Sequence, residues 1–152
     1  MLNASDITVV IDTREKKKLV LEHAKGSILN SIDGTLYTGD YSILGLEELV
    51  CIERKSVDDL IGSITKHRER FEKEIQRMKG YATRAIVVES TWNDIEKGNY
   101  YSKMHPNSAL GTLMGYIAQG IPIIMAGTHK KAGVFVARML YITARRRYRE
   151  LE

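Results

Sequence analysis

Apolar and polar residues along the chain form blocks that predict strands and helices in alternation. Short, almost continuous apolar runs are typical of buried strands. These runs lie at 7–12, 84–89 and 121–126. Between and after them come segments with helical spacing or helix-forming residues. We expect helices at 17–24, 57–78, 91–96, 108–119 and 129–150. Strands alternating with helices predict an α/β fold with a mixed central sheet.

Several residues mark where the predicted helices begin and end. Ser56 and Thr128 each precede a helix and can accept hydrogen bonds from the N–H groups of its first turn. Gly26 and Gly80 each follow a helix, as glycine commonly does. The residues at 66–67 are expected to break the long helix over 57–78 into two parts.

An antiparallel meander is predicted before that long helix, and its last two strands form a hairpin. Segment 27–36, with a turn near its end, leads to two short apolar segments at 41–44 and 49–52. If the inner ends of the last two segments are directly opposed, Tyr41 faces Ile52 on the neighbouring strand. The pairing of these two strands therefore determines which charged residues face each other at the outer ends of the hairpin.

In this register, two carboxylates lie directly opposite each other. Asp40 opposes Glu53, and Lys55 lies on the same face because side chains alternate along a strand. Opposed like charges are destabilising, and a divalent cation between them would remove that cost. Mg²⁺ accepts one or two protein carboxylates and fills its remaining positions with water and phosphate oxygens. The hairpin therefore predicts a metal site.

Nearby charged residues are candidates for the rest of such a site. Asp12 ends the first apolar run and is a candidate third ligand, while Glu15 can act through an outer-shell water. Arg14 and Arg54 can pair with the acids or with a phosphate through the guanidinium fork. A metal would lower the pKa of a bound water, and Lys55 could orient that water or neutralise developing charge. The alternative is a set of solvated charges on a sheet face.

The order of these charged residues resembles a known family. The chain reads Asp-Thr-Arg-Glu at 12–15, Gly-Asp at 39–40 and Glu-Arg-Lys at 53–55, with Asp59 four residues after the lysine. This pattern resembles the nuclease domain of the XPF-type structure-specific endonucleases (excision-repair cross-complementing group four). The resemblance implies a restriction-endonuclease-like core with a central mixed β-sheet flanked by helices. It also implies dependence on Mg²⁺ or Mn²⁺ and cleavage of branched, flap or fork DNA.

The resemblance also implies which residues form the active site. They are Asp12, Arg14, Glu15, Asp40, Glu53, Arg54, Lys55 and Asp59. Of these, Asp40, Glu53 and Asp12 are the expected metal ligands. Asp59 has an alternative role, because it follows Ser56 by three residues and can complete a capping box at the start of the helix.

Basic residues outside these motifs are candidates for DNA contact. They are Lys16, Lys66, Arg68, Arg70 and Lys103. The alternative for those within 57–78 is a solvated helix face. The net charge of +4 and the isoelectric point of about 9.1 give a mild attraction to polyanions.

The last two predicted helices carry more apolar surface than one sheet needs. In the helix over 129–150, two apolar stripes lie side by side, and the helix over 108–119 is also broadly apolar. Both surfaces could belong to an ordinary core. The resemblance implies that the C-terminal helices pair with a second copy, so we expect a homodimer.

Length, cysteine content and hydropathy narrow the remaining possibilities. The length suits one domain, and we expect a single nuclease domain over 1–152, without the tandem helix-hairpin-helix module of larger members of the resembling family. The single cysteine cannot form an internal disulfide. No signal-peptide pattern and no apolar run of about 20 residues is present. We therefore expect an intracellular protein, cytoplasmic or nucleoid-associated if the source is a bacterium or phage.

Three functions remain open at this point. The first is a metal-dependent, structure-selective DNA endonuclease that leaves 5′-phosphate ends. The second is a restriction-like or junction-resolving nuclease with the same chemistry. The third is a non-catalytic DNA-binding scaffold subunit, against which the presence of Asp40, Glu53 and Lys55 argues.

Overall fold

A mixed β-sheet with helices on both faces forms the centre of the molecule. The structure is a computed structural model that describes residues 2–151. In that range the main sheet has the strand order β4-β1-β5-β6-β7-β8. The strands are β1 (Thr8–Asp12), β4 (Asn30–Gly34), β5 (Tyr41–Ile43), β6 (Val50–Ser56), β7 (Thr83–Glu89) and β8 (Ile123–Met125). β5 runs antiparallel to both of its neighbours, and the other pairs are parallel. The predicted α/β fold with a mixed sheet is confirmed.

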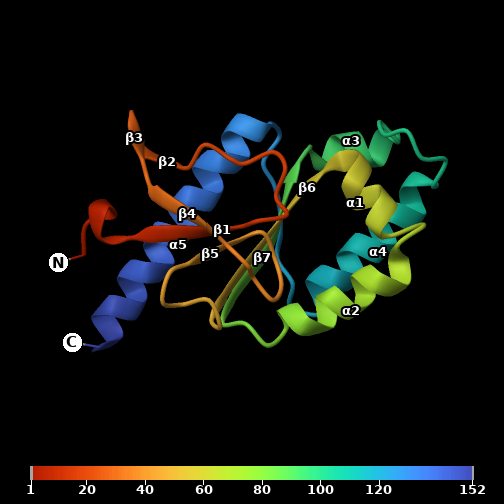
Figure 1. The fold of residues 1–152 in the computed structure, drawn as a ribbon. Coiled ribbons are helices and arrows are strands. Elements are labelled where there is room, and N and C mark those ends of the chain that lie inside the picture. The colour runs from red at the N-terminus through yellow and green to blue at the C-terminus, as the bar shows by residue number, and fades with distance from the viewer. Residues whose placement is uncertain (1, 152) are drawn as a thin grey trace.

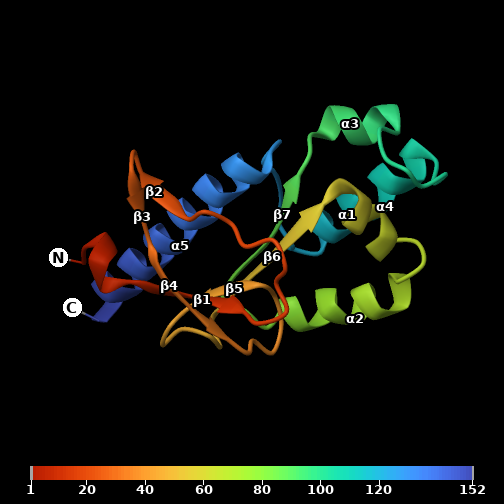
Figure 2. The same cartoon turned by 45° about the horizontal axis from the view of Figure 1, so that its top comes forward.

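The helices divide between the two faces of the sheet (Figures 1 and 2). They are η1 (Ala4–Asp6), α1 (Val57–Ser63), α2 (Arg68–Met78), α3 (Trp92–Lys97), α4 (Pro106–Ala118) and α5 (His129–Leu151). The long α5 covers one face of the sheet, where residues of β1, β5, β6 and β7 pack against it. The other helices α1 to α4 cover the opposite face and build a second core with β6, β7 and β8. None of the helices described within 2–151 combines the length and apolar character needed to cross a membrane.

Helix limits follow the predicted capping residues closely. The Ser56 hydroxyl accepts a hydrogen bond of 3.2 Å from the Asp59 N–H at the start of α1. The Thr128 hydroxyl accepts one of 3.1 Å from the Lys131 N–H at the start of α5. The predicted break near 66–67 is present, because α1 ends before it and α2 begins after it. Local side-chain chemistry therefore determines these boundaries.

The predicted pairing of the hairpin is correct at its centre, and alternation along β6 carries it to the charged residues. Tyr41 pairs with Ile52. Ile52 packs in the core beneath α5, whereas the adjacent Cys51 packs in the core formed by α1, α2 and α4. Because side chains alternate along a strand, Glu53 takes the face of Cys51 and the next residue, Arg54, takes the face of α5.

The predicted helix over 17–24 is wrong. The chain is extended in this segment, and Glu22–Ala24 forms β2, which pairs antiparallel with β3 (Ser27–Ile28). Gly26, expected to end a helix, lies in the turn between these strands with a φ of 78°.

Long-range contacts explain the extended conformation of this segment. The Leu19 N–H donates a 2.8 Å hydrogen bond to the Tyr41 hydroxyl. Leu19 and Leu21 are buried while Val20 between them is exposed, which is the alternation of a strand. A Cβ at Gly133 would lie 2.1 Å from the Val20 carbonyl oxygen, so the segment lies directly against α5. These contacts outweigh the helix propensity of the segment.

The predicted antiparallel meander over 27–36 is also wrong. β4 pairs in parallel with β1, from Asn30 opposite Thr8 to Gly34 opposite Asp12. Gly34 therefore ends an edge strand and does not form a turn, and a Cβ there would lie 2.9 Å from a methyl carbon of Val10. The close packing of β4 on β1 brings the loop after Gly34 to the carboxyl end of β1.

Candidate active site

A hollow of about 230 Å³ lies where the loop over 35–40, the strand β6 and the helix α2 meet. Its lining combines acidic, basic and aromatic side chains. It consists of Asp12, Arg14, Tyr37, Thr38, Gly39, Asp40, Glu53, Arg70, Glu74 and Arg77. The fold therefore brings together five of the residues that the sequence singled out, from segments far apart in the chain. These five are Asp12, Arg14, Asp40, Glu53 and Arg70.

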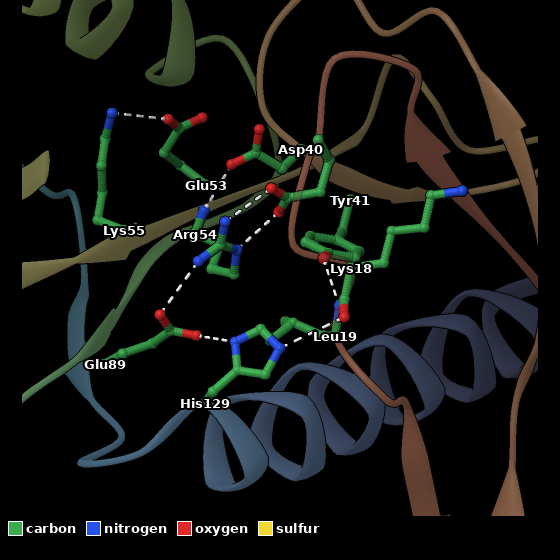
Figure 3. Close-up of polar contacts among 10 residues, drawn as sticks. Lys18, Leu19, Asp40, Tyr41, Glu53, Arg54, Lys55, Glu89 and His129 are labelled. Carbon is green, nitrogen blue, oxygen red and sulfur yellow. Dashed lines mark hydrogen bonds and ion pairs between the residues drawn. The ribbon is translucent and has the colours of Figure 1, made fainter.

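Asp40 and Glu53 are held next to each other by the pairing of β5 with β6. The Asp40 N–H donates to the Ile52 carbonyl oxygen at 2.8 Å, and the Arg54 N–H donates to Oδ2 of Asp40 at 2.8 Å. Figure 3 shows the carboxylates of Asp40 and Glu53 on the same side of β6. The backbone of β6 thus fixes the orientation of the Asp40 carboxylate.

Both carboxylates of this pair are destabilised in their charged form. Burial raises the pKa of Asp40 to about 6, although the hydrogen bond from the Arg54 N–H opposes the shift. Burial also raises the pKa of Glu53 well above its ordinary value, and the negative charges of Asp40 and Glu74 add to that effect. A bound cation would relieve this cost, so the donor set fits a hard divalent ion.

These carboxylates suit a metal ion that takes only a few of its ligands from the protein. Within residues 2–151, no group of three or more His, Cys, Asp or Glu side chains is placed to hold a metal ion together. Asp40 and Glu53 would therefore supply two carboxylates, with water and phosphate oxygens in the other positions. Mg²⁺ is commonly bound in this way, because it gives up its waters reluctantly.

Gly39 is required for the approach of the loop to β6. It has a φ of 88°, a conformation that residues with a Cβ rarely adopt. A Cβ at this position would lie 2.7 Å from the Cys51 sulfur and 3.2 Å from the Ile52 carbonyl oxygen. The glycine of the Gly-Asp pair therefore lets Asp40 reach its place beside Glu53.

Lys55 is a fixed positive charge beside the acids. Its Nζ lies 3.1 Å from Oε2 of Glu53 and 5.1 Å from the centre of the Phe71 ring. Burial alone would lower the pKa of Lys55, but the charges of Glu53 and Glu74 outweigh it and raise the pKa above its ordinary value. Lys55 is therefore protonated at neutral pH and acts as a cation.

Asp12 and Arg14 hold the loop that carries Asp40. Oδ2 of Asp12 accepts hydrogen bonds from Nε of Arg14 at 2.8 Å and from the Arg14 N–H at 3.1 Å. Oδ1 of Asp12 accepts from the Leu36 N–H at 2.9 Å, and Nη2 of Arg14 donates to the Leu36 carbonyl oxygen at 2.9 Å. Burial would raise the pKa of Asp12, but these hydrogen bonds lower it overall. The predicted role of Asp12 as a metal ligand stays a prediction, and its observed contacts position the loop.

Glu15 and Arg54 lie on the other side of β6 and do not line the hollow. Nε and Nη2 of Arg54 each donate to Glu15 at 2.7 Å, and Nη1 donates to Glu89 at 3.1 Å. Glu89 also contacts Nδ1 of His129 at the start of α5. Figure 3 shows this chain of contacts running from Arg54 through Glu89 to His129. The guanidinium of Arg54 is therefore occupied by carboxylates inside the protein.

The sequence did not indicate a site role for four residues, which are Glu74, Arg77, Glu89 and His129. Arg70, which was singled out, lines the hollow together with Glu74 and Arg77. The spacing of these three residues, four and then three apart, places them on one face of α2. Glu89 ends an apolar run as Asp12 does, which is a comparable signal. His129 gave no signal, because its partner is remote in the sequence.

The remaining predicted residues lie outside the hollow. Asp59 is exposed in the first turn of α1, where its N–H is capped by Ser56. The other predicted DNA-contacting residues are exposed, and Lys66 lines a separate basic hollow that it shares with Arg70 along α2. Lys16, Arg68 and Lys103 line neither of these hollows.

Sequence and structure comparisons place the chain in a family. Residues 11–139 match the ERCC4 domain. The chain is an α/β domain with a mixed sheet, and it belongs to the ERCC4 domain family. The predicted resemblance to the XPF-type nuclease domain is confirmed.

Two curated relatives align with part of their own length. A protein of Methanocaldococcus jannaschii, provisionally described as an ATP-dependent RNA helicase, is 30% identical over 119 residues, which cover 78% of this chain and 13% of that protein. The DNA repair endonuclease XPF of Mus musculus is 36% identical over 88 residues, which cover 57% of this chain and 9% of that protein. The chain therefore spans only a small part of the length of either relative.

Solved structures share the fold at low sequence identity. XPF from Aeropyrum pernix has a TM-score of 0.69 at 18% identity, covering 90% of this chain and 61% of that one. The same protein in complex with DNA has a TM-score of 0.71 at 18% identity, covering 91% of this chain and 66% of that one. The architecture of the XPF nuclease fold is therefore present in this chain.

Proposed function

We propose that this domain is a divalent-metal-dependent endonuclease that hydrolyses phosphodiester bonds in branched, flap or fork DNA. The observation that carries the proposal is the half-buried Asp40 beside the buried Glu53, with the cation of Lys55 3.1 Å from Glu53. Family membership adds support, because one relative is named a DNA repair endonuclease and one structural neighbour is a complex with DNA.

Side chains in the hollow and Lys55 beside it have distinct roles in the proposed reaction. Asp40 and Glu53 would hold Mg²⁺ or Mn²⁺, which when bound polarises the phosphate and lowers the pKa of a coordinated water. In the hydrolysis, a water oxygen attacks phosphorus and the bond from phosphorus to the 3′ oxygen breaks. The products are a 5′-phosphate and a 3′-hydroxyl. Lys55, which keeps its proton, neutralises negative charge that develops at the phosphate.

Basic residues near the hollow supply the proposed contacts with DNA phosphates. Arg14 and Arg70 line the hollow itself, and Lys66 extends the positive charge from Arg70 along α2. The exposed residues Lys16 and Lys103 would add contacts farther away. Contacts of this kind position DNA without reading its sequence, which suits recognition of a DNA structure.

The direct test offers flap, fork, four-way-junction and plain duplex DNA, each with Mg²⁺, Mn²⁺ or EDTA. We expect cleavage of the branched substrates only with a metal, and loss of cleavage but not of binding in Asp40→Asn. Cutting of duplex at fixed sequences would instead indicate a restriction-like enzyme. Binding without cutting in both metals would indicate a scaffold subunit.

We further propose that the domain forms a homodimer through α5 and β8. Phe135 and Ile142 of α5 are 40% and 37% exposed. They line a largely apolar groove with Ile124, Met139 and Arg138. Light scattering should give a dimer that Phe135→Glu converts to a monomer. A monomeric wild-type protein at tens of micromolar would reject this proposal.

A further inference from the structure

The loop at the rim of the hollow is fixed on both sides of Tyr37. On one side, the Leu36 N–H and carbonyl group are bonded to Asp12 and Arg14 at 2.9 Å each. On the other side, the buried Thr38 accepts a 3.0 Å hydrogen bond on its hydroxyl from Nε of Arg77. The loop therefore holds the backbone of Tyr37 in one place beside the acids.

The side chain of Tyr37 is nevertheless directed into solvent. It is 82% exposed, although it lines the same hollow as Asp40 and Glu53. The guanidinium of Arg77 lies 5.9 Å from the centre of its ring, within the range of a cation–π contact. A fixed loop thus presents an open aromatic ring, supported by a cation, at the entrance to the proposed active site.

We propose that Tyr37 is a stacking platform for an unpaired base next to the scissile phosphate. The inference rests on the proposed function and names the feature of the substrate that this site selects. Bases stack on exposed aromatic rings whatever their sequence, and nearby cations follow the phosphate backbone. Arg14, Arg70 and Arg77 line the hollow around Tyr37 and are suited to that second task.

This stacking requires that the base has left its helix. In an intact duplex each base is already stacked on both sides, so its faces are not open to a side chain. Near a fork or flap, unpaired bases are free to stack on protein rings. Tyr37 would therefore favour cleavage beside an unpaired nucleotide and would give selectivity for DNA structure within this one domain.

The test uses fork DNA with the fluorescent base 2-aminopurine at the unpaired position beside the scissile phosphate. Binding is measured with Asp40→Asn protein, so that the DNA stays uncut. Stacking quenches 2-aminopurine, and we expect quenching with Tyr37 and with Tyr37→Phe. Tyr37→Leu, which keeps apolar bulk but has no ring, should abolish quenching. It should also weaken fork binding roughly tenfold, while binding to a plain duplex stays unchanged.

The outcomes separate this proposal from the proposed function. Equal weakening on fork and duplex, or quenching that persists in Tyr37→Leu, overturns the stacking role. Quenching that depends on Tyr37, combined with a wild-type protein (Asp40 intact) that cuts no DNA in Mg²⁺ or Mn²⁺, supports stacking and overturns the nuclease. A protein that binds none of these DNAs overturns both. Because Tyr37 is 82% exposed, the variants should fold normally, and an unchanged melting temperature checks this.

Discussion

The two sides of β6 differ in how their charged groups are paired, although the three residues concerned are consecutive in the sequence. Glu53 and Lys55 lie on one side, and Arg54 lies on the other. On the α5 side, Arg54 is paired with Glu15 and Glu89, and its polar atoms have partners inside the protein. On the α2 side, Glu53 faces Asp40 with Lys55 as the nearest cation. On the α5 side the carboxylates share hydrogen bonds with one guanidinium, whereas on the α2 side burial raises the pKa of both Asp40 and Glu53.

The contrast separates charges that stabilise the fold from charges that are costly when no cation is bound. Burying an ionised group destabilises the folded protein unless an oppositely charged or hydrogen-bonding partner offsets the loss of hydration. The Glu15 carboxylate has such a partner, and hydrogen bonds from Arg54 outweigh burial to hold its pKa below the ordinary value. The pKa values of Asp40 and Glu53 are raised instead. A protein keeps such a costly pair where function requires it.

A change on the α2 side should reduce DNA cleavage more strongly than any other substitution proposed below. Asp40→Asn should reduce the rate of DNA cleavage by roughly 10³-fold, because it removes one carboxylate from the proposed metal site. Single-turnover cleavage of a labelled fork measures this. Asp33→Asn is the matched control, since Asp33 is an exposed carboxylate paired only with Lys18. An Asp40→Asn enzyme with wild-type rates would show that the pair has no catalytic role.

The next effect is on stability, from a change on the α5 side. Arg54→Met should lower the free energy of unfolding by about 3–5 kcal/mol, because it leaves the Glu15 carboxylate without its guanidinium and leaves Glu89 with His129 alone. Urea denaturation measures the loss. Arg68→Met breaks an exposed pair with Glu72 and should cost at most about 0.5 kcal/mol. Equal stability of the two variants would show that the network does not support the fold.

A third change tests the close approach of the loop over 35–40 to β6. Gly39→Ala should cost about 2–3 kcal/mol, because it adds a contact with Cys51 to an unfavourable backbone conformation. Gly45→Ala has a similar φ of 90° but open space around its Cβ, so it should cost about 1 kcal/mol. Cleavage should fall in the first variant only. The same result for both would mean that the close approach to β6 is unimportant.

The smallest effect is the dependence of metal-free stability on pH. Since the pKa of folded Asp40 is raised to about 6, its stabilising contribution is complete below the unfolded value near 4. It is lost as pH rises through about 6. At pH 8 and without metal, Asp40→Asn should therefore be more stable than wild type by about 1–2 kcal/mol. Added Mg²⁺ should stabilise the wild type but not the variant in thermal melts. If Asp40→Asn were less stable than the wild type at pH 8 without metal, the predicted direction of the stability change would be wrong.

Local features of the sequence predicted much of this molecule. The pairing of Tyr41 with Ile52 and the face shared by Asp40 and Glu53 follow from alternation along two adjacent segments. The caps at Ser56 and Thr128 follow from side-chain chemistry within one turn. In each case the interacting residues lie close in sequence or are joined by a short turn.

What could not be predicted depends on contacts between distant segments. The extended chain at 17–24 is held by the Tyr41 hydroxyl and by the close approach to Gly133, neither of which is visible in local periodicity. Similarly, the spacing of Glu74 and Arg77 shows that they share a helix face with Arg70, but not that this face closes the hollow. The long-range partner decides the role in each case.

The alternation within β6 also limits how this protein can evolve. A single residue inserted before Glu53 would turn every following side chain to the opposite side of the strand. The guanidinium of Arg54 would then enter the hollow, while an acid and an ammonium group would be buried under α5. Substitutions can adjust either side separately, but any change in the length of this strand would disrupt the proposed active site and the fold together. Related sequences should therefore differ here in residue identity and never by a gap.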